Sequence, residues 1–189
     1  WQHVHAFDFG PAETSTGTLG QNIATFPVNI DQMQAYINAG DITFRNFDRD
    51  TRGIYAIEYF LFAIEDYDAL TSNDWLYLLA VTDQVKSQLE SVTESWKSSY
   101  RQSFIENDGT DAGSSVSLLV NSFALSYEAI KNFKLGLPLG LRPGQSQSEP
   151  TLVEAYYSGL GLELAHQHLK ALDALWIGQS LDGSRKGLG

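Results

Sequence analysis

The sequence predicts an all-α protein, most simply antiparallel helices packed as bundles. Three observations support this class. Apolar residues recur every three or four positions in each long segment, no segment alternates apolar and polar residues as a half-buried strand does, and no internal repeat is visible. With 189 residues, of which 43% are hydrophobic, the chain is large enough to bury a core.

The first third of the chain is the least regular. Residues 1–9 fit the end of a helix that Gly10 and Pro11 stop. A short helix is expected over 31–38, closed by Gly40, and a more apolar helix over 53–64.

The cleanest helical periodicity runs from residue 75 to residue 100, where apolar residues step by threes and fours among charged ones. Thr71 and Asp74 have the spacing of a capping box that would open this helix, and Asn107 begins the segment that closes it.

Two further helices are expected in the second half. One covers 113–135 and ends at Gly136, and an ordered loop rich in Gly and Pro follows over 136–149. The other begins at Pro150, which the first turn of a helix accepts, and continues to Gly178 before a Gly-rich polar tail over 180–189.

The composition excludes several function classes. A net charge of −11 opposes nucleic-acid binding and adsorption to anionic lipid. The absence of cysteine excludes disulfides, thiolate metal sites and thiol nucleophiles, and no apolar run is long enough to span a bilayer. The chain begins at Trp1 without a leader segment, so an export signal was either removed or never present.

Glu58 is the strongest candidate for a functional residue. It lies on the apolar face of the expected helix 53–64, with Tyr55 one turn before it and Leu61 one turn after it. A buried carboxylate needs a cation, a metal ion or hydrogen-bond donors. Two interpretations stay open: Glu58 belongs to a binding site, or it forms an ion pair with Arg52 or Arg49 that holds the preceding loop.

The histidines give a weaker signal. They form two His-x-His pairs, His3 with His5 and His166 with His168, and residues two apart on a helix point in opposite directions. A helix-surface position is therefore expected for His166 and His168. Zincin, P-loop and nucleophile-elbow motifs are absent, so no catalytic residue is assigned.

Three stretches together resemble the imelysin-like proteins, also classed as peptidase family M75. The stretches are Trp1-x-x-x-His5-x-Phe7-x-Phe9-Gly10-Pro11, then 52–62 (RGIYAIEYFLF), then Gly136-Leu137-Pro138-Leu139-Gly140 with 153–159 (VEAYYSG). The resemblance spans residues 1–178. It implies an exported bacterial protein of the periplasm or cell envelope, often a lipoprotein, built as two four-helix-bundle-like halves and associated with iron uptake.

The family signature Gly-x-His-x-x-Glu, a suspected metal-binding element, falls on Gly53, Tyr55 and Glu58. Tyr55 replaces the histidine, which disfavours zinc peptidase chemistry because a neutral phenol is a poor zinc ligand. Ferric iron does accept phenolate. The family commonly has an acid where this chain has His5.

These departures lead to a metal-site hypothesis. His5, Tyr55 and Glu58 line one pocket and bind iron or another divalent metal, with Arg52, Gly53 and Arg49 nearby. The alternative is that both departures reflect a degenerate site.

The resemblance also implies a division of the chain. Residues 1–70 would belong to a first helical bundle and 71–189 to a second. Because the chain is short for the family, the bundles are expected to be incomplete at their ends, and a partner chain or missing segments would cover the exposed apolar stripes.

The leading hypothesis is a non-catalytic, exported imelysin-like protein that binds an iron species or another small ligand near Glu58. Anchoring would come from a lipid upstream of this chain. A metallopeptidase with a variant metal site is the first alternative, and a structural or surface-interaction protein without a metal site is the second.

Overall fold

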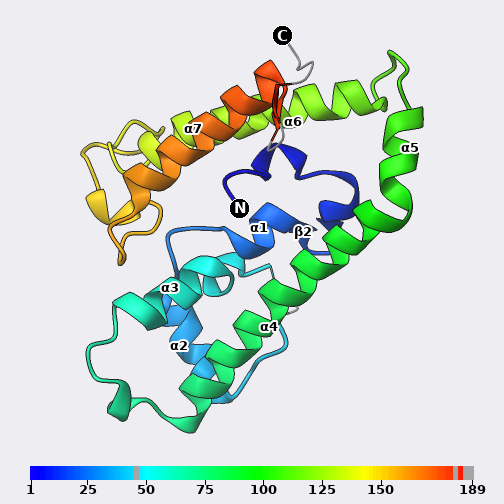
Figure 1. Cartoon of the computed structure of the whole chain (residues 1–189). Coiled ribbons are helices and arrows are strands. Elements are labelled where there is room, and N and C mark those ends of the chain that lie inside the picture. Colours follow the sequence, from blue (N-terminus) through cyan, green and yellow to red (C-terminus); the bar gives the residue numbers. More distant parts are fainter. Residues whose placement is uncertain (45–46, 181–182, 185–189) are drawn as a thin grey trace.

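A computed structural model describes residues 1–44, 47–180 and 183–184 of the chain (Figure 1). Within these residues the protein is mostly helical, as the sequence predicts. The short 3₁₀ and π segments are η1 (His5–Phe7), η2 (Gly10–Ala12), η3 (Arg49–Thr51), η4 (Tyr67–Ala69), η5 (Trp96–Tyr100), η6 (Ile130–Leu135) and η7 (Pro150–Leu152). The α-helices are α1 (Leu19–Ile23), α2 (Ile30–Ala39), α3 (Ile54–Phe62), α4 (Ser72–Ser95), α5 (Arg101–Glu106), α6 (Ser115–Ala129) and α7 (Gly161–Ile177).

Two minimal antiparallel hairpins accompany the helices. In the first, β1 (Glu13–Thr14) pairs with β2 (Gly17–Thr18), and in the second, β3 (Gln179–Ser180) pairs with β4 (Gly183–Ser184). The sequence showed no strand pattern because pairs of two residues are too short to establish one. Most of the predicted polar tail over 180–189 lies outside the described residues.

The predicted helix boundaries hold where capping residues define them. The Thr71 side chain accepts from the Asp74 backbone N–H and the Asp74 side chain accepts in return, so α4 begins with the expected capping box. Gly40 and Gly178 adopt the left-handed conformation at the ends of α2 and α7. A π segment continues α4 into α5, and another extends α6 to Leu135.

Two predicted helical segments are wrong. Residues 1–9 form turns and the short η1, whose Ala6 is buried against Ile130 and Leu172. Residues 153–160 form turns instead of the first part of one helix over 150–178, because Ala155 has a φ of 52° and Gly159 a φ of 71°. A side-chain spacing compatible with a helix was overridden here by contacts with the rest of the fold.

The helices form two groups joined by the N-terminal segment. In one group α2 and α3 pack on α4 around a core cluster that includes Met33, Phe60 and Tyr77. In the other, α6 packs on η1 and α7, as Figure 1 shows above α1. The contacts of α4 with α2 and α3 cross the predicted boundary between residues 70 and 71, and the division into units 1–70 and 71–189 stays a prediction.

None of the helices in the described ranges is both long enough and apolar enough to cross a membrane.

Candidate functional site

Glu58 lies on α3 and is buried, as its apolar neighbours predict, with only 8% of its surface exposed. Its Oε1 accepts the backbone N–H of Ser158 at 2.6 Å. Among the described residues this is its one hydrogen bond, and neither Arg49 nor Arg52 forms an ion pair with it. Of the two interpretations, the ion pair with Arg49 or Arg52 is therefore not formed.

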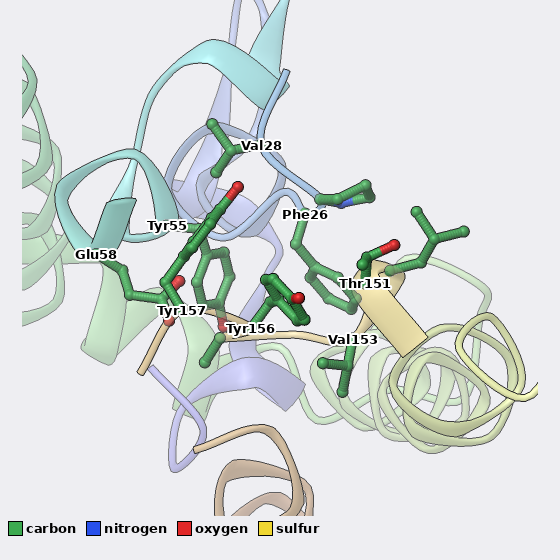
Figure 2. Close-up of a pocket in the computed structure, with 11 residues that line it drawn as sticks. Phe26, Val28, Tyr55, Glu58, Thr151, Val153, Tyr156 and Tyr157 are labelled. Atoms are coloured by element: carbon green, nitrogen blue, oxygen red, sulfur yellow. The ribbon is translucent and has the colours of Figure 1, made fainter. Parts of the chain in front are cut away.

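Glu58 and Tyr55 line a cavity of about 280 Å³ between α3 and the turns that follow η7 (Figure 2). Phe26, Tyr156 and Tyr157 contribute further aromatic walls. We call this cavity the Glu58 pocket. It exists because residues 153–160 leave the helical path and place two consecutive tyrosines opposite α3.

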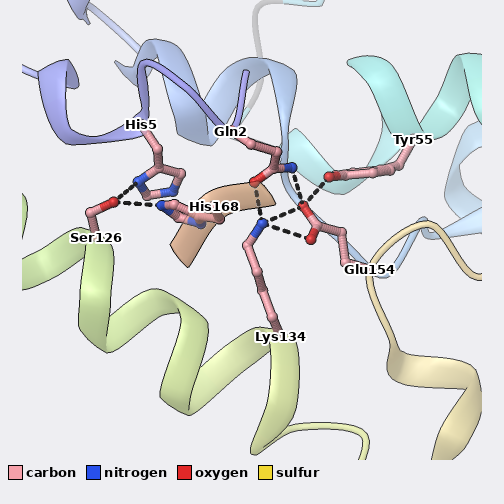
Figure 3. A network of polar contacts seen from close by, with 7 residues as sticks. All are labelled: Gln2, His5, Tyr55, Ser126, Lys134, Glu154 and His168. Atoms are coloured by element: carbon pink, nitrogen blue, oxygen red, sulfur yellow. Dashed lines mark hydrogen bonds and ion pairs between the residues drawn. The ribbon is translucent and has the colours of Figure 1, made fainter. Parts of the chain in front are cut away.

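The Tyr55 hydroxyl points to the other side of the pocket wall, where it donates a hydrogen bond to Glu154 (Figure 3). Burial, followed by the negative charge of Glu154, raises the pKa of Tyr55 far above its ordinary value. The phenol therefore keeps its proton at neutral pH and acts as a donor.

Glu154 is the centre of a buried ionic cluster. Lys134 Nζ lies 2.7 Å from Glu154 Oε2 and 2.9 Å from Oε1, and Gln2 Nε2 donates to Oε1 at 3.0 Å. Lys134 also donates to the Gln2 side-chain oxygen. Burial lowers the pKa of Lys134 and the charge of Glu154 opposes this shift. Every member has a partner, which is the condition for burying an ion pair.

A second polar cluster adjoins the first. The Ser126 hydroxyl lies 2.9 Å from His5 Nδ1 and 2.6 Å from His168 Nε2 (Figure 3). Burial is the main cause that lowers the pKa of His5 to about 4 and that of His168 to about 3, so both rings are neutral at pH 7. Since one hydroxyl has one proton, at most one of the two imidazoles accepts from Ser126, and at least one donates to it.

A second cavity of about 430 Å³ adjoins both clusters. His5, Ser126, Lys134 and Glu154 line this second cavity. The side chains of Tyr55 and Glu154, joined by their hydrogen bond, therefore form part of the wall between the cavities.

The remaining predicted site residues have structural roles near the start of α3. Arg52 is buried and donates to the Phe44 carbonyl and to Asn22, and Arg49 donates to the Thr16 carbonyl. Gly53 precedes α3 with a φ of 85°, and a Cβ at this position would lie 2.5 Å from the Ile23 carbonyl oxygen.

Comparison with known protein families matches residues 1–188 to imelysin, peptidase family M75. The chain belongs to the imelysin family. This confirms the resemblance found from the motifs.

A solved structure agrees with this assignment at the level of the fold. The chain is similar to a protein from Parabacteroides distasonis ATCC 8503 that is described as an iron-regulated protein A precursor, with a TM-score of 0.76 and 17% identity. The alignment covers 100% of this chain and 62% of that one, so the chain spans less than two thirds of the solved protein. No curated protein matches the chain.

Metal binding in this imelysin-like chain can be judged from the donors that the fold provides. Tyr55 is a proton donor to Glu154, His5 is hydrogen-bonded to Ser126, and the ammonium of Lys134 lies beside Glu154. In the ranges that the structure describes, no group of three His, Asp or Glu side chains could hold a metal ion. Tyr55 and His5 are therefore engaged by partners within the fold, and joint coordination of a metal by His5, Tyr55 and Glu58 stays a prediction.

Sequence reasoning missed the ionic cluster and misjudged His168. Glu154 has Thr151 one turn before it and Ser158 one turn after it, so the pattern that selected Glu58 does not mark Glu154. His168 is fully buried, contrary to the surface position expected for it, whereas His166 is exposed. No local sequence pattern marks Ser126, because its partners His5 and His168 lie 121 and 42 positions away along the chain.

Proposed function

We propose that this chain is part of an exported, non-catalytic imelysin-like protein of the cell envelope that binds a small ligand in the Glu58 pocket. The observation that carries the proposal is the state of Glu58. It is a buried carboxylate that lines a cavity of about 280 Å³ and, among the described residues, has a single backbone donor as its partner. Ligand sites combine such concave, mostly apolar walls with a few polar groups.

An association with iron uptake is part of the proposal. The similar solved protein is described as iron-regulated. The family resemblance implies an association with iron uptake. An iron species is therefore the first ligand to test, although the donors of the described residues favour a ligand other than a bare metal ion.

Binding is better supported than peptidase chemistry. A catalytic zinc site needs three protein ligands and an open position for water. Tyr55 occupies the histidine position of the family motif and donates to Glu154, which leaves Glu58 as the single acidic member of the motif in the pocket.

The chain would also supply only part of each four-helix half. Leu125 on α6 and Leu162 on α7 are 70% and 67% exposed, which is typical of helix faces that another segment covers. Because the solved protein is longer than the alignment, we propose that further segments of a longer, lipid-anchored chain cover these faces, rather than a partner chain.

The first experiment measures what the pocket binds. Protein purified without chelators is analysed for metal content and by native mass spectrometry, and is then titrated with ferrous, ferric and zinc ions beside Glu58→Gln. We expect a stoichiometric ligand, metal or organic, that the variant loses. If wild type and variant retain and bind the same species equally, Glu58 is a structural acid and the proposal is wrong.

A further inference from the structure

The walls of the Glu58 pocket are built from aromatic rings. Phe26 and Tyr55 meet at a centroid distance of 5.7 Å with an interplanar angle of 79°. Tyr156 and Tyr157 meet at 5.2 Å with an angle of 76°. The two rings of each pair are therefore nearly perpendicular. Figure 2 shows that all four rings lie around the same pocket.

These rings are held in place by other parts of the fold. Tyr59 on α3 packs edge-on against Tyr157 at 5.2 Å, and the Tyr55 hydroxyl is tied to Glu154. Burial, with smaller contributions from Tyr59 and Glu58, raises the pKa of Tyr157. The rings are therefore preorganised neutral surfaces, which reduces the entropy lost when a ligand binds.

Within the part of the chain that the structure describes, no cation balances the negative charge of Glu58 in the pocket. Among the described residues no group donates to the second carboxylate oxygen of Glu58. Lys134 is committed to Glu154 in the adjoining cluster. Arg49 donates to the Thr16 carbonyl, and Arg52 donates to the Phe44 carbonyl in the loop before α3. A buried carboxylate in this state favours a positively charged ligand.

The residues that line the Glu58 pocket indicate which kind of cation it binds. A metal ion needs several oxygen or nitrogen donors at once. Here one carboxylate shares the pocket with aromatic rings, and the faces of such rings attract cations whose charge is spread over alkyl groups. A volume of about 280 Å³ lies just below the ~300–1,000 Å³ range of small-molecule sites, which indicates a small ligand.

We propose that the Glu58 pocket binds a small alkylated ammonium group, which sits against the rings of Phe26, Tyr156 and Tyr157 and is neutralised by Glu58. This inference rests on the proposed function, because it names the ligand class of the same pocket.

The test uses matched probes in isothermal titration calorimetry. Choline and tetramethylammonium are compared with 3,3-dimethylbutan-1-ol, a neutral molecule of the same shape as choline. We expect choline to bind at least 10-fold more tightly than the neutral alcohol. Glu58→Gln should remove this preference, since the amide oxygen still accepts the Ser158 N–H but carries no charge.

Two further variants distinguish a loss of binding at the pocket from a loss of folding. Tyr156 is 45% exposed, so Tyr156→Leu should fold normally and weaken choline binding at least 5-fold. Glu90→Gln removes one negative charge from an exposed position on α4 and should leave binding unchanged. Circular dichroism and urea midpoints close to wild type establish that each variant is folded.

The outcomes distinguish this inference from the proposed function. If the neutral alcohol binds as tightly as choline and Tyr156→Leu weakens both, the pocket binds ligands but the cation inference is wrong. Binding of ferric or zinc ions that depends on Glu58, without choline binding, also overturns it and leaves the iron proposal in place. If no probe, metal ion or co-purified ligand depends on Glu58, both proposals fail.

Discussion

Glu154 and Glu58 are both buried glutamates, and their surroundings differ. Glu154 is 1% exposed and contacts an ammonium, a phenol and an amide, whereas Glu58 is 8% exposed and has one backbone N–H beside a cavity. The charge of Glu154 is neutralised by Lys134 within the fold. Among the described residues no cation neutralises the charge of Glu58, so the two glutamates differ in the completeness of their partners and not in burial alone.

The largest effect should come from breaking the ion pair. Lys134→Met leaves Glu154 buried without its cation, and we expect the free energy of unfolding to fall by about 3–5 kcal/mol. Urea denaturation measures this loss, and the double variant Lys134→Met/Glu154→Gln should recover a large part of the lost free energy. A single variant as stable as wild type would show that the pair is not a structural element.

Gly53→Ala tests the backbone that carries both Tyr55 and Glu58. The φ of 85° alone costs about 1–3 kcal/mol for alanine, and the collision of its Cβ with the Ile23 carbonyl adds to this. Gly144→Ala is the matched control, because its φ is 91° but nothing lies within 4 Å of the added Cβ. Equal losses for the two variants would show that the contact with Ile23 is unimportant.

The histidine cluster should make stability depend on pH. The unfolded chain protonates His5 and His168 near their ordinary pKa of ~6.5, whereas the folded protein holds them neutral down to about pH 4 and about pH 3. The unfolded state therefore binds more protons in this window, and the free energy of unfolding should fall as the pH is lowered from 7.5 to 5, by up to about 2 kcal/mol for each histidine.

Urea denaturation at the two pH values checks this dependence. His168→Gln should reduce the difference between them, whereas His166→Gln, at an exposed position, should leave it unchanged. A pH dependence that is identical in wild type and His168→Gln would contradict the buried neutral cluster.

The smallest effect on stability is expected at Glu58. Glu58→Gln keeps an oxygen for the Ser158 N–H and removes no ion pair, so the free energy of unfolding should change by less than about 1 kcal/mol. Glu154→Gln, which strands Lys134, should cost several times more. Equal costs for the two variants would remove the distinction between the structural and the binding glutamate.

Much of the candidate site was predictable because it follows from local patterns. The burial of Glu58 and Tyr55 follows from the apolar face of α3. The polar clusters were not predictable in the same way, since Gln2, Lys134 and Glu154 are brought together across as many as 152 residues of sequence. Their pairing depends on how α6 and the N-terminal segment pack.

The sequence by itself determined the helical class, the capped ends of α2 and α4, the family and the buried position of Glu58. Periodicity and capping depend on neighbours within one or two turns, so they can be read from the sequence. Only the tertiary structure decided that residues 153–160 leave the helix, because the contacts of Glu154 with Lys134 and of Ser158 with Glu58 join segments far apart in sequence. The same contacts decided which glutamate is neutralised within the fold and which one faces a pocket.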